Sequence, residues 1–180
     1  MKILQAASSL FYAHGIHAIG VDTIAAHAGV SKKTLYERFG SKERLITEYL
    51  IERDSQWCSF LTDRLEWAAT NPAERVAAIF HASAEWAAQR GTKGCGMINA
   101  HAEISDPAHP AYAVIVGQKR WMLTLFHTEA HHICPSESEE LAEQLMLLHE
   151  GAMVSAGMDT FEGAFDRAIA VARHLMTRAL

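Results

Sequence analysis

Residues 21–39, with the sequence VDTIAAHAGVSKKTLYERF, constrain the fold more than any other part of the chain. Apolar residues recur at helical spacing before Gly29 and again after it, which predicts two short helices. Gly29 supplies the backbone freedom that a sharp turn between helices requires. Ser31 fits the N-cap of the second helix, because its hydroxyl can accept a free backbone N–H. The stretch therefore predicts a helix-turn-helix motif.

The second helix of this motif carries a polar outer face. Leu35 and Phe39 fall on the side that packs against the first helix, which leaves a hydroxyl, a phenol and two ammonium groups outside. Such side chains donate to phosphate oxygens and base edges in a major groove. We therefore expect DNA contacts from Lys32, Lys33, Thr34 and Tyr36.

The stretch from Ile3 to Leu50 resembles the DNA-binding domain of TetR-family transcriptional regulators. The resemblance is carried by IAAHAGVSKKTLY at residues 24–36 and FGSKE at residues 39–43. It implies an all-α fold with an N-terminal three-helix helix-turn-helix domain at 1–45 and a helical ligand-binding and dimerisation domain at 46–180. About nine helices fit the capping and breaking signals.

The resemblance also implies a function. We expect a sequence-specific repressor that binds a palindromic double-stranded DNA operator as a homodimer and is released by a small-molecule effector. Ser31 and Lys42 join the expected DNA contacts, since free N–H groups at a helix start favour phosphate. A helical protein-interaction module is the alternative of another class, favoured if Lys32, Lys33 and Tyr36 are buried.

Charge and composition agree with a DNA-binding regulator in the cytoplasm. The net charge of the 180 residues is −5, yet residues 1–50 carry six Lys and Arg against four Asp and Glu. Positive charge is thus concentrated where phosphates would lie. No apolar run approaches the roughly 20 residues that span a bilayer, and no leader opens the chain, so neither membrane nor export is expected.

Two apolar stripes near the C-terminus predict a dimer interface. A helix starting at Pro135 and another starting at Asp159 carry apolar residues one or two turns apart. The resemblance implies that this pair joins its symmetry mate in a four-helix bundle; the alternative is that both stripes seal the core of one protomer. The stripes comprise Leu141, Leu145, Leu148, Ala152, Phe165, Ile169, Ala172 and Met176.

The helical body is expected to hold the effector among aromatic and Met side chains with a few polar groups. Asn99 and Glu103, in the segment GCGMINAHAE, share one helical face; they either enter this pocket or tie neighbouring helices together. Gly96 stands where related segments have proline, which should loosen the turn. The expected effector contacts are Trp57, Phe60, Trp86, Asn99, Glu103, Trp121, Phe126, His149 and Met153.

Other chemistries find less support in the sequence. His127, Glu129, His131, His132 and Cys134 resemble a metal-ligand set, but they sit at a helix end where a solvated cap is expected. The three cysteines suggest no disulfide framework. No catalytic or nucleotide-binding motif is present, so we expect no enzyme, no cofactor and no resident metal. A metal- or thiol-responsive regulator of the same fold is the alternative within the class.

Overall fold

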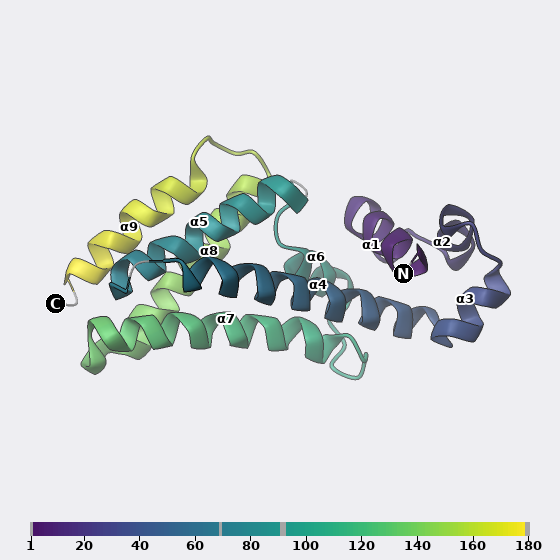
Figure 1. Ribbon diagram of the computed structural model, residues 1–180, viewed down its shortest axis with the longest axis horizontal. Helices are drawn as coiled ribbons and strands as arrows, with labels where there is room; N and C mark the ends of the chain where they lie inside the picture. Colours follow the sequence, from purple (N-terminus) through teal and green to yellow (C-terminus); the bar gives the residue numbers. More distant parts are fainter. Residues whose placement is uncertain (1, 69, 91–92, 179–180) are drawn as a thin grey trace. The chain divides into compact units, whose positions relative to one another are not determined.

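The computed structural model describes residues 2–68, 70–90 and 93–178. Within these ranges the chain forms nine α-helices, one 3₁₀ turn and no strand, so the predicted all-α fold is confirmed. Figure 1 shows the helices in chain order. They are α1 (Lys2–His14), α2 (Val21–Ala28), α3 (Lys32–Phe39), α4 (Lys42–Glu66), α5 (Pro72–Arg90), α6 (Gly96–Glu103), α7 (Tyr112–Ile133), η1 (Pro135–Glu137), α8 (Ser138–Gly157) and α9 (Ala164–Arg178).

Local signals in the sequence account for several helix ends. Gly29 closes α2 in the left-handed region, at φ 67°, and the Ser31 hydroxyl accepts the Thr34 N–H at 3.0 Å at the start of α3. At the start of α5, Asn71 Oδ1 accepts the Ala73 N–H at 2.9 Å. The predicted cap at Ser31 is confirmed, and Asn71 acts in the same way, because side-chain oxygens satisfy N–H groups that no helical carbonyl can reach.

Two predicted helix starts were wrong by several residues. The helix expected from Pro135 begins at Ser138, because Pro135–Glu137 form a separate 3₁₀ turn. The helix expected from Asp159 begins at Ala164, because Asp159 has φ 52° and Gly163 has φ 72°. Left-handed backbone at both positions interrupts a right-handed helix.

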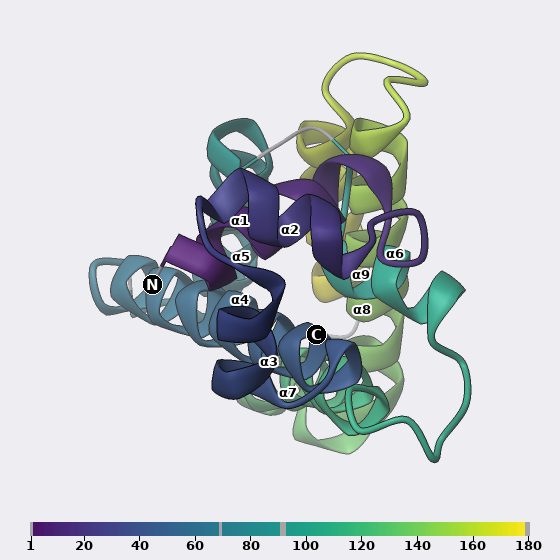
Figure 2. The same ribbon diagram turned by 90° about the vertical axis from the view of Figure 1, so that its right-hand side faces the viewer.

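One compact unit combines the residues up to Gln56 with Gly96–Gln118. In it α1 packs against α2, and α2 packs against α3 (Figure 2). Its buried side chains come from the helix-turn-helix region and also from α6, which is distant in the chain; they include Phe11, Ile24, Leu35, Leu45, Met97, Ala100 and Ile104. These are units of packing, and the domain boundary at residue 45 stays a prediction.

The second unit combines Trp57–Cys95 with the residues from Lys119 onward. In it α8 packs against α9, and α5 packs against both (Figure 1). The unit boundaries fall inside α4 and α7, so each of these helices supplies residues to both units. None of the helices in the described ranges is both long and apolar enough to cross a bilayer.

Candidate nucleic-acid interface and helical body

The helix α3 presents the polar face that the sequence predicts. Leu35 is completely buried, whereas Ser31, Lys32, Lys33 and Thr34 are exposed. Tyr36 is 41% exposed, which is high for an aromatic side chain. The Ser31 hydroxyl is engaged with Thr34, so its part in this face is to cap the helix. The arrangement places ammonium and phenol donors on the surface, where a polyanion can reach them.

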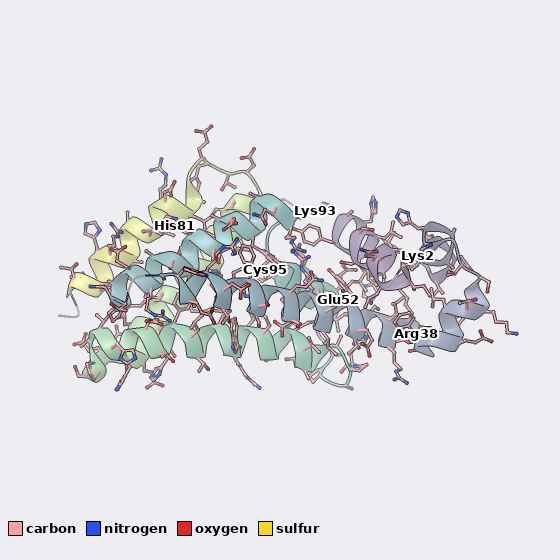
Figure 3. The ribbon with its side chains drawn as sticks, viewed as in Figure 1. Lys2, Arg38, Glu52, His81, Lys93 and Cys95 are labelled. Atoms are coloured by element: carbon pink, nitrogen blue, oxygen red, sulfur yellow. The ribbon has the colours of Figure 1, made fainter. Side chains whose placement is uncertain are left out.

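Charged neighbours hold two of these donors loosely in place. Lys32 Nζ donates to Asp22 Oδ2 at 3.0 Å, and this contact raises the pKa of the Lys32 ammonium. Lys33 Nζ lies 3.7 Å from Glu37 Oε1, one turn along α3. Both pairs are solvent-exposed, so they exchange readily for phosphate. Arg38 in the last turn of α3 is also exposed and adds a further positive charge to this helix (Figure 3).

Lys42 differs from the other predicted DNA contacts. Its side chain is half-buried, and Nζ donates to the backbone oxygen of Ile16 at 2.9 Å. Ser41 caps α4 by accepting the Arg44 N–H at 3.2 Å. Lys42 therefore braces the loop between α1 and α2, and a phosphate contact would use its remaining N–H donors.

The eight predicted interface residues are not exposed on the surface of the protomer. Leu148 is half-buried, and the other seven are buried in the core of the second unit. This is the alternative considered for the two stripes, that they seal one protomer. The same helices expose a different apolar set: Leu147 at 74%, Val154 at 42% and Met158 at 70% on α8 or its end, and Val171 at 46% on α9.

Three predicted effector residues form one aromatic cluster in the second unit. The Trp57 and Trp86 rings meet edge to face, with centroids 5.5 Å apart, and Phe60 lies 5.2 Å from Trp86. Trp57 Nε1 donates to the sulfur of Met122 at 3.4 Å, which satisfies its polar atom inside the core. Trp121 is half-buried in the same unit, and Met153 is buried.

His149 links this apolar core to a chain of polar groups. Its ring lies 5.7 Å from each of the Phe80 and Phe126 rings. The hydroxyl of Ser83 donates to Ile79 O at 2.9 Å and lies 2.7 Å from His149 Nε2. A serine hydroxyl has one hydrogen to donate, so the direction of its contact with Nε2 follows from the tautomer of the imidazole.

The polar chain continues from His149 through two charged side chains. His149 Nδ1 lies 3.4 Å from Glu150 Oε1, and Lys119 Nζ donates to the same oxygen at 2.9 Å and to Cys95 Sγ at 3.1 Å. Burial alone would raise the pKa of the Glu150 carboxyl, but His149 and Lys119 outweigh it and lower that pKa. Burial alone would lower the pKa of the Lys119 ammonium, but Cys95 and Glu150 raise it.

Sequence reasoning missed most of this polar chain. His149 was identified, whereas Ser83, Lys119 and Glu150 were not assigned to any site. Lys119 and Glu150 come from different helices, so no spacing within one helix indicates their contact. The one signal in the sequence for this contact was a basic residue, Lys119, inside a largely apolar helix.

Asn99 and Glu103 belong to the other packing unit. Glu103 accepts the backbone N–H groups of Ile16 and His17, at 2.8 and 2.6 Å. Glu103 thus ties α6 to the loop between α1 and α2, which was the alternative to a role in the effector pocket. Gly96 begins α6 and is buried, and an added Cβ would overlap the side chain of Arg53. Its lack of a side chain makes room for that guanidinium.

The residues considered as a metal-ligand set differ in burial and in partners. Glu129 is buried and pairs with Arg75 at 2.9 Å, whereas His127, His131 and His132 are exposed. In the described part of the chain, no group of three His, Cys, Asp or Glu side chains is placed to hold a metal ion.

The comparisons with known proteins agree with this geometry. The family model described as "Bacterial regulatory proteins, tetR family" matches residues 3–49, which contain the helix-turn-helix. The crystal structure of a TetR-family transcriptional regulator from Streptomyces coelicolor superposes with a TM-score of 0.91 at 26% identity, covering 99% of this chain and 94% of that one. Residues 3–49 thus match the DNA-binding part of the TetR family, and the chain shares the fold of a TetR-family transcriptional regulator.

Two curated relatives match part of this chain. The HTH-type transcriptional repressor KstR2 of Mycolicibacterium smegmatis is 35% identical over 47% of this chain. The HTH-type transcriptional activator FasR of the same organism is 37% identical over 43% of this chain. The matches cover 40% and 36% of these relatives, so the chain spans less than half of their length. Both are named as regulators rather than enzymes, in agreement with the sequence analysis.

Proposed function

We propose that this protein is a sequence-specific DNA-binding transcriptional regulator that acts as a repressor. The observation that carries the proposal is the exposed donor face of α3, with Lys32, Lys33 and Tyr36 outside and Leu35 buried. Had the three donors been buried, the protein-interaction alternative would have been favoured. The partner is a double-stranded DNA operator, and a regulator of chromosomal DNA works in the cytoplasm.

A homodimer completes the proposal, since two recognition helices must enter successive major grooves. The stripe Leu147, Gly151, Val154 and Met158 supports a revised interface on α8. These residues follow one another at four, three and four positions, which places them on one helical face. Nothing lies within 4 Å of a Cβ added at Gly151, so a second helix can approach closely there. The two-fold axis of such a dimer demands a palindromic operator.

A small-molecule effector would act on the second unit. The aromatic cluster of Trp57, Phe60 and Trp86 and the polar chain at His149 supply apolar contact together with hydrogen-bond partners. Contacts of these two kinds suit a compact, mainly apolar molecule with one or two polar atoms. Its binding would favour a body conformation that is incompatible with the operator.

The thiol-responsive alternative keeps one supporting observation. Cys95 is a free, half-buried cysteine whose sulfur lies 3.1 Å from the Lys119 ammonium. A free thiol is the group that a thiol-responsive regulator requires. Operator binding after treatment with iodoacetamide distinguishes a thiol response from release by an effector. If the protein responds through Cys95, the treatment should lower the operator affinity of wild type but not that of a Cys95→Ser variant.

Selection of genomic fragments by the purified protein tests the proposed function. Wild type should enrich a small set of sites with two-fold symmetry, and a Lys33→Ala, Tyr36→Phe double variant should not. The genes beside the sites would then guide a search for the effector. Recovery of no preferred sequence by wild type would refute the proposal.

A further inference from the structure

The carboxylate of Glu103 at the end of α6 holds the loop between α1 and α2. Oε1 accepts the Ile16 N–H at 2.8 Å and Oε2 accepts the His17 N–H at 2.6 Å. Gly15 turns the chain just before these amides, at φ 91°, and a Cβ added there would lie 3.1 Å from Oε1. The loop and the carboxylate are therefore in close contact.

A second charged side chain holds the same loop. Lys42 Nζ, at the start of α4, donates to Ile16 O at 2.9 Å. The N–H and the carbonyl of Ile16 are thus both bonded to charged groups from other elements, and its side chain is 3% exposed. Hydrogen bonds to charged groups are about twice as strong as neutral ones.

The other end of α6 is also fixed within this unit. Gly96 lies against the side chain of Arg53 on α4, and the Arg53 guanidinium lies over the ring of Tyr12 on α1, 4.4 Å from its centroid. Contacts at both ends make α6 a brace of the helix-turn-helix region.

The loop leads directly into the two helices of the motif. After His17 the chain reaches Gly20, whose carbonyl accepts the Ile24 N–H at 3.2 Å and so opens α2. Ile24 on α2 and Leu35 on α3 are both fully buried, so the positions of the two helices are coupled through the core. A shift of the loop is thereby transmitted to α3.

We propose that Glu103 is a positioning residue for DNA binding: its carboxylate fixes the α1–α2 loop and, through α2, the recognition helix α3. The proposal rests on the proposed DNA-binding function.

Amide hydrogen exchange and operator affinity test the proposal in the full-length protein. Glu103→Ala should speed exchange at the Ile16 and His17 amides by roughly tenfold or more and lower affinity for the selected operator by about fivefold or more. The salt dependence of binding should not change, because no phosphate contact is lost. Glu103→Gln keeps one acceptor oxygen and should give intermediate values. Glu52→Ala is the control, since the Glu52 carboxylate accepts from Gln56 on its own helix (Figure 3).

Each failure has a distinct meaning. Unchanged exchange at Ile16 and His17 in Glu103→Ala would refute the contact. Faster exchange with unchanged operator affinity would refute the positioning role and leave Glu103 merely structural. Equal affinity losses in Glu103→Gln and Glu103→Ala would also overturn it, because the retained oxygen should rescue part of the effect. If wild type selects no operator, the proposed function fails, whereas the exchange data still decide on the contact.

Discussion

The two packing units use charge in opposite ways. The unit with the helix-turn-helix exposes ammonium groups at Lys32 and Lys33 and pairs them only with surface carboxylates. The second unit encloses Lys119 and Glu150, with 23% and 21% of their side chains exposed, and exposes an apolar stripe instead. Exposed charge contributes little to folding and much to the binding of a polyanion, whereas removing one partner of an enclosed pair leaves the other charge buried and lowers stability. Substitution of Lys33 should therefore cost binding, and substitution of Glu150 should cost stability.

The largest expected effect is on assembly. Gly151→Glu places a charge on the exposed α8 stripe, where it would be buried without a partner between protomers. We expect the dimer Kd to rise about 100-fold or more, with helicity unchanged because the added side chain meets open space in the protomer. Sedimentation velocity would show monomers. Trp67→Glu, at a residue 90% exposed outside the stripe, is the control and should stay dimeric; a dimeric Gly151→Glu protein would move the interface elsewhere.

A smaller effect should follow from the enclosed charge. Glu150→Gln removes the carboxylate that meets Lys119 and should lower the free energy of unfolding by about 2 kcal/mol at pH 7. The folded protein lowers the pKa of Glu150 from 4.5. Its contribution is therefore complete above pH 4.5 and is lost as the pH falls through the lowered folded pKa.

Urea denaturation at several pH values checks this expectation. The difference between wild type and Glu150→Gln should shrink on acidification below pH 4.5. Glu140→Gln is the matched control, since Glu140 is exposed on the same helix and accepts only a local bond from Gln144 at 2.9 Å. A stability difference that is absent at pH 7, or as large for the control, would show that enclosed charge does not distinguish the second unit.

The cap of the recognition helix should give an effect of about 1 kcal/mol on stability. Ser31→Ala leaves the Thr34 N–H without its acceptor, and loss of an N-cap typically costs about that amount. Thermal unfolding measures it, with Ser31→Asp as the variant that restores an acceptor. Operator affinity should fall as well, because the start of α3 frays. A Ser31→Ala protein as stable as wild type would mean that the cap contributes nothing.

Substitutions on the exposed face of α3 should have the smallest effect on stability. Lys33→Ala and Tyr36→Phe should change the free energy of unfolding by less than about 0.5 kcal/mol. Lys33→Ala should also reduce the salt dependence of operator binding by about one unit of slope. Titrations at several salt concentrations would measure this. Unchanged affinity in both variants would contradict the assignment of this face, and a large loss of stability would remove the contrast between the units.

Local chemistry made the helix-turn-helix region readable from sequence. The turn at Gly29, the cap at Ser31 and the buried Leu35 each depend on residues within one or two helical turns. The exposed donors follow from the same periodicity. The predicted helix start at Asp159 was wrong because this residue has left-handed backbone, which a residue other than glycine rarely adopts.

Contacts between distant residues account for what the sequence did not predict. Helical spacing identifies an apolar stripe but not its partner, so Leu145 and Ile169 were assigned to a dimer interface although they are buried within the protomer. The bond from Glu103 to Ile16 joins residues 87 positions apart, and no pattern near either residue indicates it. The effector contacts stay a prediction.

The discontinuous unit limits how this protein can be divided. A gene fragment ending at residue 45 would encode the recognition helix but omit α6, whose Met97 and Ala100 are buried in that unit. Chimeric regulators that transplant such a fragment onto a foreign body would lack the Glu103 contact with Ile16. A transplant that preserves the native surroundings of the motif must also carry Gly96–Gln118, so the helix-turn-helix region is not modular at the level of the linear sequence.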